Sequence, residues 1–162
     1  MDLHLEPPHG VWPVRLGMTL DEAVAAATTW DEPRVRTRRG SRRGSLSTSC
    51  EGVGVEVLLE EEDTVTAVEL WWPGEGKVSP ARVLLNGQDV FRTPAVDVLG
   101  LLGEQGWRVH DAGGEDPFVA GLSLGFTRRT SQEVPREPGG LPVCLTSVLV
   151  GGESYYDFRV QG

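Results

Sequence analysis

The sequence is poor in cysteine, and this excludes the common cysteine-based sites. Cys50 and Cys144 are the two cysteines, they lie far apart, and neither belongs to a CxxC pair or a zinc-ligand spacing. We therefore expect two buried free thiols rather than a disulfide or a metal centre.

Long hydrophobic runs are also missing. No apolar stretch approaches the roughly 18 residues that a membrane-spanning helix needs. The start, Met-Asp-Leu-His-Leu-Glu, has neither the basic region nor the apolar region of a signal peptide. Hydrophobic residues make up 39% of the chain, which is ordinary for a globular protein. We expect a soluble, cytoplasmic protein with no membrane partner, and the pattern leaves its oligomeric state open.

The familiar catalytic and cofactor motifs are absent as well. The sequence contains no Walker, HExxH, EF-hand or dinucleotide-binding pattern. The stretch "GLSLG" matches the nucleophile-elbow pattern around Ser123, but no histidine follows His110 in the chain, where that fold requires one. We expect a protein that is not an enzyme and that carries no cofactor and no metal.

Two segments have the pattern of short amphipathic helices. In "GMTLDEAVAAATTW", Thr19 and Glu22 form a capping box and Pro33 follows the helix. In "RTPAVDVLGLLGEQG", Thr93 is the expected N-cap and Pro94 the first helical residue. In both, apolar residues recur at i, i+3, i+4 and i+7: Leu20, Ala23, Val24 and Ala27, then Ala95, Val98, Leu99 and Leu102.

The remaining segments favour antiparallel strands. We expect strands at 34–37 and 46–50, a hairpin of "GVEVLL" and "TVTAVELWW" with an acidic tip at Glu60 to Asp63, and a hairpin turn at Asn86-Gly87. Later strands are expected at 107–109, 118–127, 143–150 and 155–160. The predicted fold is α+β, with two similar helix-plus-antiparallel-sheet repeats, 1–78 and 79–162, in a single compact unit. One continuous sheet with both helices on one face uses the same elements and stays open as an alternative.

The segment "LGMTLDEAVAAA" is similar to the helix-opening "GMT-x-x-x-V" segment of two kinds of small protein. One is the secreted beta-lactamase-inhibitor protein, and the other is the small lipoprotein group that helps to assemble outer-membrane proteins. The resemblance implies helix-plus-sheet repeats with a sheet face that can grip another protein. It covers a dozen residues of the first half, and the second half lacks the motif.

The segment "RVRTRRGSRR" concentrates positive charge. Its six arginines, in ten residues without an acid, leave a formal net charge of −15 for the rest of a chain whose total is −9. That field opposes a nucleic acid, and no aromatic residue is interleaved to stack on bases. A solvated loop that can pair with the acidic tip, a partner-docking loop and a kinase site at Ser45 are the other interpretations.

Neighbouring aromatic residues supply the candidate contact residues. Trp71-Trp72 and Tyr155-Tyr156 are each expected in a strand, so that one member of each pair points away from the core. Our main hypothesis is a protein-binding module, immunity- or inhibitor-like, whose acidic surface masks a basic toxin or enzyme. The alternatives are a small-ligand binder or enzyme with a pocket between the repeats, lined by His110, Ser123 and a buried carboxylate, and a nucleic-acid accessory factor that uses Arg34–Arg43. The candidate partner-binding residues are Trp72, Tyr155, Tyr156, Glu60, Glu61, Glu62, Arg38, Arg39, Arg42 and Arg43.

Overall fold

The structure is a computed structural model, and it describes residues 1–37, 44–60 and 63–161. The candidate residues Arg38, Arg39, Arg42, Arg43, Glu61 and Glu62 lie outside the described residues, so their expected roles stay predictions.

The elements in chain order are β1 (Asp2–Glu6), β2 (Gly10–Val11), β3 (Val14–Arg15), α1 (Leu20–Ala27), β4 (Arg34–Thr37), β5 (Gly44–Cys50), β6 (Val53–Leu59), β7 (Ala67–Trp71), β8 (Arg82–Leu85), β9 (Gln88–Asp89), α2 (Ala95–Glu104), β10 (Phe118–Val119), the 3₁₀ turn η1 (Ala120–Leu122), β11 (Leu124–Thr127), β12 (Ser147–Gly151) and α3 (Asp157–Gln161).

The described strands form two sheets that both cross the boundary between residues 78 and 79. The large sheet is antiparallel throughout and has the order β10-β11-β12-β7-β6-β5-β4, so that β7 of the first half pairs with β12 of the second. The small sheet has the order β3-β2-β1-β8-β9, and its parallel β1–β8 pair also joins the halves. The predicted α+β class is confirmed, whereas the description as two repeats is not.

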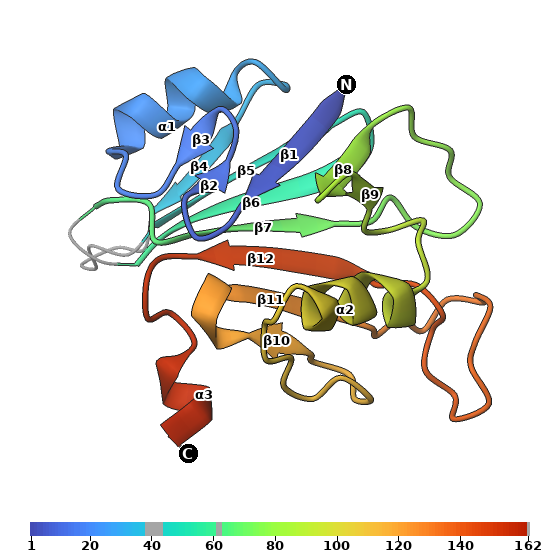
Figure 1. Ribbon diagram of the computed structural model, residues 1–162. Coiled ribbons are helices and arrows are strands. Elements are labelled where there is room, and N and C mark those ends of the chain that lie inside the picture. Colours follow the sequence, from blue (N-terminus) through green and yellow to red (C-terminus); the bar gives the residue numbers. More distant parts are fainter. Residues whose placement is uncertain (38–43, 61–62, 162) are drawn as a thin grey trace.

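One side of the large sheet carries the core. In the row Leu46, Val57, Val68, Val150 and Leu124, five neighbouring strands each contribute a residue that is at most 1% exposed. The buried residues of α1, α2 and the small sheet belong to the same hydrophobic cluster. Figure 1 shows α1 and the small sheet together on one side of the large sheet. The opposite side of the large sheet is therefore where most of its polar side chains lie.

The helices begin close to where the sequence places them. The capping box at the start of α1 is confirmed, since the Glu22 N–H donates to Thr19 Oγ1 over 3.3 Å and the Thr19 N–H donates to Glu22 Oε1 over 3.2 Å. At α2 the expectation was wrong by one residue, because Pro94 is the N-cap and Thr93 lies outside the helix. Pro94 has an extended backbone, and the Ala95 N–H donates to the carbonyl of Val143 over 2.8 Å.

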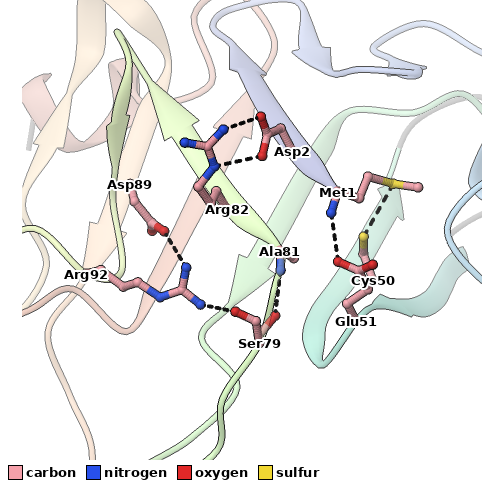
Figure 2. Close-up of polar contacts among 9 residues, drawn as sticks. All are labelled: Met1, Asp2, Cys50, Glu51, Ser79, Ala81, Arg82, Asp89 and Arg92. Atoms are coloured by element: carbon pink, nitrogen blue, oxygen red, sulfur yellow. Dashed lines mark hydrogen bonds and ion pairs between the residues drawn. The ribbon is translucent and has the colours of Figure 1, made fainter.

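The amino terminus is part of the fold. Leu3 is 0% exposed at the centre of the small sheet, between β2 and β8. Figure 2 shows that the Asp2 carboxylate accepts hydrogen bonds from Arg82 Nε (2.9 Å) and Nη2 (2.7 Å) across the β1–β8 pair. The terminal ammonium donates to Glu51 over 2.9 Å. Both cysteines are free, as predicted; Cys50 is buried as expected, whereas Cys144 is only half-buried.

Two turns and several strands test the local predictions. The Asn86-Gly87 hairpin is confirmed, with positive φ at both residues (51° and 80°), as a type I′ turn requires. Residues 155–160, expected as a strand, instead form a turn and α3, because the chain reverses at Ser154 (φ 69°). Residues 107–109 form no strand, and the 118–127 segment is interrupted at η1. No helix in the described part of the chain is long and apolar enough to cross a membrane.

Candidate functional site

The side of the large sheet that faces away from the core is the candidate site, and we call it the open face. Its centre consists of Glu56 and Leu58 on β6, Glu69 and Trp71 on β7, and Leu149 on β12, all half-buried. These residues alternate with core residues along their strands, which places them on the side opposite the core. The Trp71 ring lies against Gly54, its direct neighbour on β6, with Cε3 3.8 Å from where a Cβ would be.

Two carboxylates lie at the middle of the open face. Glu56 and Glu69 are directly opposite each other on β6 and β7, with Leu149 on the other side of Glu69. Burial, and secondarily the charge of Glu56, raise the pKa of Glu69 to about 7. Within the described ranges, neither carboxylate makes an ion pair. Like charges directly across a sheet are unfavourable, so this arrangement costs stability in the isolated chain.

The Glu69 side chain gives a prediction for stability against pH. Its folded-state pKa of about 7 lies above its ordinary value of 4.5, so the folded chain binds more protons than the unfolded chain between these values. Stability therefore falls as the pH rises through this window. Because the side chain is partly solvated, we expect Glu69→Gln to be about 1 kcal/mol more stable than the parent chain above neutral pH and close to it at low pH.

Urea denaturation of both chains at about pH 5 and about pH 8 measures this difference directly. The matched control is Glu133→Gln, which removes an exposed carboxylate with no such burial. The assignment of the raised pKa to Glu69 is contradicted if the parent and Glu69→Gln chains lose the same stability between the two pH values.

The carboxy-terminal segment covers one end of the open face. Tyr156 packs over Gly125 of β11 and Tyr155 over Gly151 of β12, and in both places a Cβ would overlap the ring. The Tyr155 hydroxyl donates to Glu60 Oε1 over 3.1 Å. His110, Phe118 and Tyr156 form a continuous stack, with centroids 4.6 and 5.4 Å apart. Burial raises the pKa of both phenols, to about 12 for Tyr156, which moves them still further from ionisation at neutral pH.

Arg159 also holds the carboxy-terminal segment against the rest of the chain. Its guanidinium carbon lies 3.9 Å from the Phe118 ring centroid, and its Nη2 donates to the carbonyl of Asp116 over 3.1 Å. A guanidinium over an aromatic face at this distance is attracted by the ring quadrupole. The segment is therefore held by stacking, charge and hydrogen bonds together.

The structure separates the residues that the sequence groups as one contact surface. Trp71 lies on the open face, whereas Trp72 lies against the core side, so the two neighbours point in opposite directions as expected. Tyr155 and Tyr156 both pack on the chain's own sheet, and Tyr156 is only 8% exposed. Glu60 contacts Tyr155. The open face therefore brings Glu60, Tyr155 and Tyr156 near one another without Trp72.

Sequence reasoning missed the central carboxylates. The signal was present, because Glu56 alternates with Val55 and Val57, and Glu69 with Val68 and Leu70. What the sequence could not supply is the register that places the two glutamates opposite each other.

Neither His110 nor Ser123 lines the two cavities that the structure shows where the halves meet. His110 stacks on Phe118, and Ser123 is 2% exposed in a left-handed conformation at the end of η1. Trp72 lines both of these cavities.

Comparisons with known proteins give no relative: no family model, no curated protein and no solved structure matches this chain. The described ranges contain no group of three or more His, Cys, Asp or Glu side chains that could hold a metal ion.

Proposed function

We propose that the protein is a cytoplasmic, non-enzymatic protein-binding module, immunity- or inhibitor-like, that uses its open face to bind a basic partner protein. The observation that carries the proposal is the Glu56–Glu69 pair, two adjacent carboxylates on a sheet face that make no ion pair within the described residues. A lysine or arginine of a partner would relieve the repulsion that the isolated chain carries there.

The surroundings of the pair support a protein rather than a free ion as the partner. Trp71, Leu58 and Leu149 are half-buried around the carboxylates, so apolar area that a protein partner can cover surrounds the two charges. Trp is among the residues that contribute most at protein interfaces. Strand β5 adds Ser45, Ser47 and Ser49, which extend the polar surface beside β6.

The charge of the whole molecule supports a basic partner. The formal net charge of −9 would speed the encounter with a positively charged protein, and salt would slow it. Binding next to Glu69 would also favour its ionised form, because a partner cation lowers the pKa that burial has raised. The proposed complex should therefore release a proton near neutral pH.

The test starts from affinity capture in a lysate of the source organism, followed by identification, purification and calorimetric titration of the captured protein. Against the purified partner, we expect Trp71→Ala and the double variant Glu56→Gln/Glu69→Gln each to weaken binding by about tenfold. Association of the parent chain should slow as salt is raised. Titration in buffers of different ionisation enthalpy measures the proton release.

A control variant separates the open face from the rest of the surface. Val78 is 96% exposed and lies between β7 and β8, outside the face, so Val78→Ser should bind like the parent chain. The proposal is contradicted if the captured protein binds the two open-face variants with the same affinity as it binds the parent chain and Val78→Ser. A partner with an acidic binding surface would also contradict it.

A further inference from the structure

Two adjoining cavities lie where the two halves of the chain meet. The smaller, of about 170 Å³, is lined by both halves, including Lys77, Asp89 and Arg92. The larger, of about 220 Å³, is lined mainly by apolar residues of the second half. Trp72, Glu75 and Phe91 line both cavities and so form the junction between them. Pockets for drug-sized molecules have volumes of roughly 300–1,000 Å³. Each of these cavities is smaller than that, so a small molecule would have to occupy both.

The larger cavity has the character of a pocket for one apolar group. Val134, Pro135, Val143 and Leu145 contribute aliphatic walls beside the Trp72 and Phe91 rings. The Cys144 thiol also lines it, and burial is the main cause of the raised pKa of that thiol. Removing an apolar group from water into such a cavity is favourable.

Of the charged side chains around the smaller cavity, Arg92 and Asp89 pair with each other within the protein. Arg92 Nη1 is 3.1 Å from Asp89 Oδ2, and Arg92 Nη2 donates to the carbonyl of Ser79, as Figure 2 shows. Asp89 Oδ1 also accepts from the Phe91 N–H over 3.1 Å. Arg92 and Asp89 therefore satisfy each other.

Lys77 and Glu75 are the available charges. Lys77 is the one lysine of the chain, and neither it nor the Glu75 carboxylate makes an ion pair within the described residues. Glu75 lies at the junction, and Lys77 lines the smaller cavity alone. The order along the two cavities is thus an apolar pocket, a free carboxylate and a free ammonium group.

We propose that the two cavities together bind an apolar α-amino acid. Its side chain occupies the larger cavity, its ammonium group lies by Glu75 and its carboxylate lies by Lys77. Glu75 and Lys77 are both exposed, so a molecule with only one of the two charges makes one charge-assisted contact instead of two, and water solvates the other protein charge. This site is independent of the open face.

Cys144 provides a readout inside the proposed site. Alkylation by N-ethylmaleimide, followed by peptide mapping, reports the accessibility of Cys144 separately from Cys50, which is 1% exposed. The probes are L-leucine, N-acetyl-L-leucine, which lacks the ammonium group, and L-leucinamide, which lacks the carboxylate. We expect L-leucine to slow the alkylation of Cys144 at concentrations about tenfold lower than either derivative, because each lacks one charge-assisted contact.

Matched variants assign each contact. Lys77→Gln should remove the preference for L-leucine over leucinamide, and Glu75→Gln the preference over N-acetyl-leucine. Val134→Trp should fill the larger cavity and abolish protection, with its fold checked by circular dichroism, whereas Arg108→Gln, which lines neither cavity, should behave as the parent chain. The proposal is overturned if L-leucine gives no protection, if the three probes protect equally, or if Lys77→Gln and Glu75→Gln keep the parent's preferences.

Discussion

The substitution Glu137→Gln is expected to lower the free energy of unfolding by about 3 to 5 kcal/mol, because it leaves a buried guanidinium without its counter-charge. Arg128 is 1% exposed, and its Nη2 lies 2.8 Å from Glu137 Oε1. The same guanidinium donates from Nη2 and Nε to the carbonyl of Pro142, over 3.0 and 3.3 Å. These contacts attach the 130–142 segment to the end of β11, so their loss should loosen this segment as well.

Urea denaturation followed by circular dichroism measures the loss, with Glu133→Gln as the control for removing a carboxylate from the same segment. The double variant Arg128→Met/Glu137→Gln tests the cause. Its loss of stability should be smaller than the sum of the losses of the two single variants, because Arg128→Met removes the guanidinium charge that Glu137→Gln leaves unpaired. Additive losses would mean that the two side chains stabilise the fold independently, and a loss below about 1 kcal/mol would mean that water solvates Arg128 once its partner is gone.

The parts of the fold that depend on neighbouring residues could be predicted from the sequence. The capping box at Thr19 and Glu22 and the type I′ turn at Asn86-Gly87 form where the sequence places them, because each is determined by the side chains of a few consecutive residues. The strand at 34–37 was also correctly bounded.

The parts of the fold that depend on pairing between residues far apart in the sequence could not be predicted. Nothing in the amino-terminal sequence indicates that β1 pairs with β8, about half the chain away, and this pairing makes Leu3 a core residue. Tyr155-Tyr156 has the residue types of a strand, but the chain reverses at Ser154 just before it and both rings pack over glycines of the sheet. Local propensity is a weak guide where tertiary packing decides.

The candidate site shows the same division. Alternation in "VEVLL" and "AVELWW" places both central glutamates on one side of their strands, so the polar character of the open face could be predicted. The same alternation places Trp71 on the side of Glu69 and Trp72 on the side of Leu70, so the sequence also carries the signal that favours Trp71 over Trp72 on the open face. The cavities by Trp72 require the 130–146 segment to return to the junction of the halves, which no local pattern indicates.

Replacing Gly151 with alanine should detach the carboxy-terminal segment from the open face. A methyl group at Gly151 would overlap Cβ and Cγ of Tyr155, and the Cβ atom cannot move unless the backbone of the segment moves with it. At Gly125 the overlap is with the hydroxyl end of the Tyr156 ring, which a side-chain rotation can relieve in part. Neither glycine has a positive φ, so the effect of alanine is steric and not a backbone preference.

We therefore expect Gly151→Ala to lower the free energy of unfolding by about 2 to 3 kcal/mol and Gly125→Ala by less, as overpacking typically does. Hydrogen exchange should rise in residues 153–161 of both variants while β7 and β12 stay protected. Gly139→Ala is the control, because it places the same methyl group in open space. If Gly151→Ala keeps the parent's stability and exchange, the Tyr155 ring does not hold the segment on the sheet. If it exposes the segment, the region of the open face around β11 and β12 becomes accessible, and a partner that binds there should bind this variant more tightly than the parent chain.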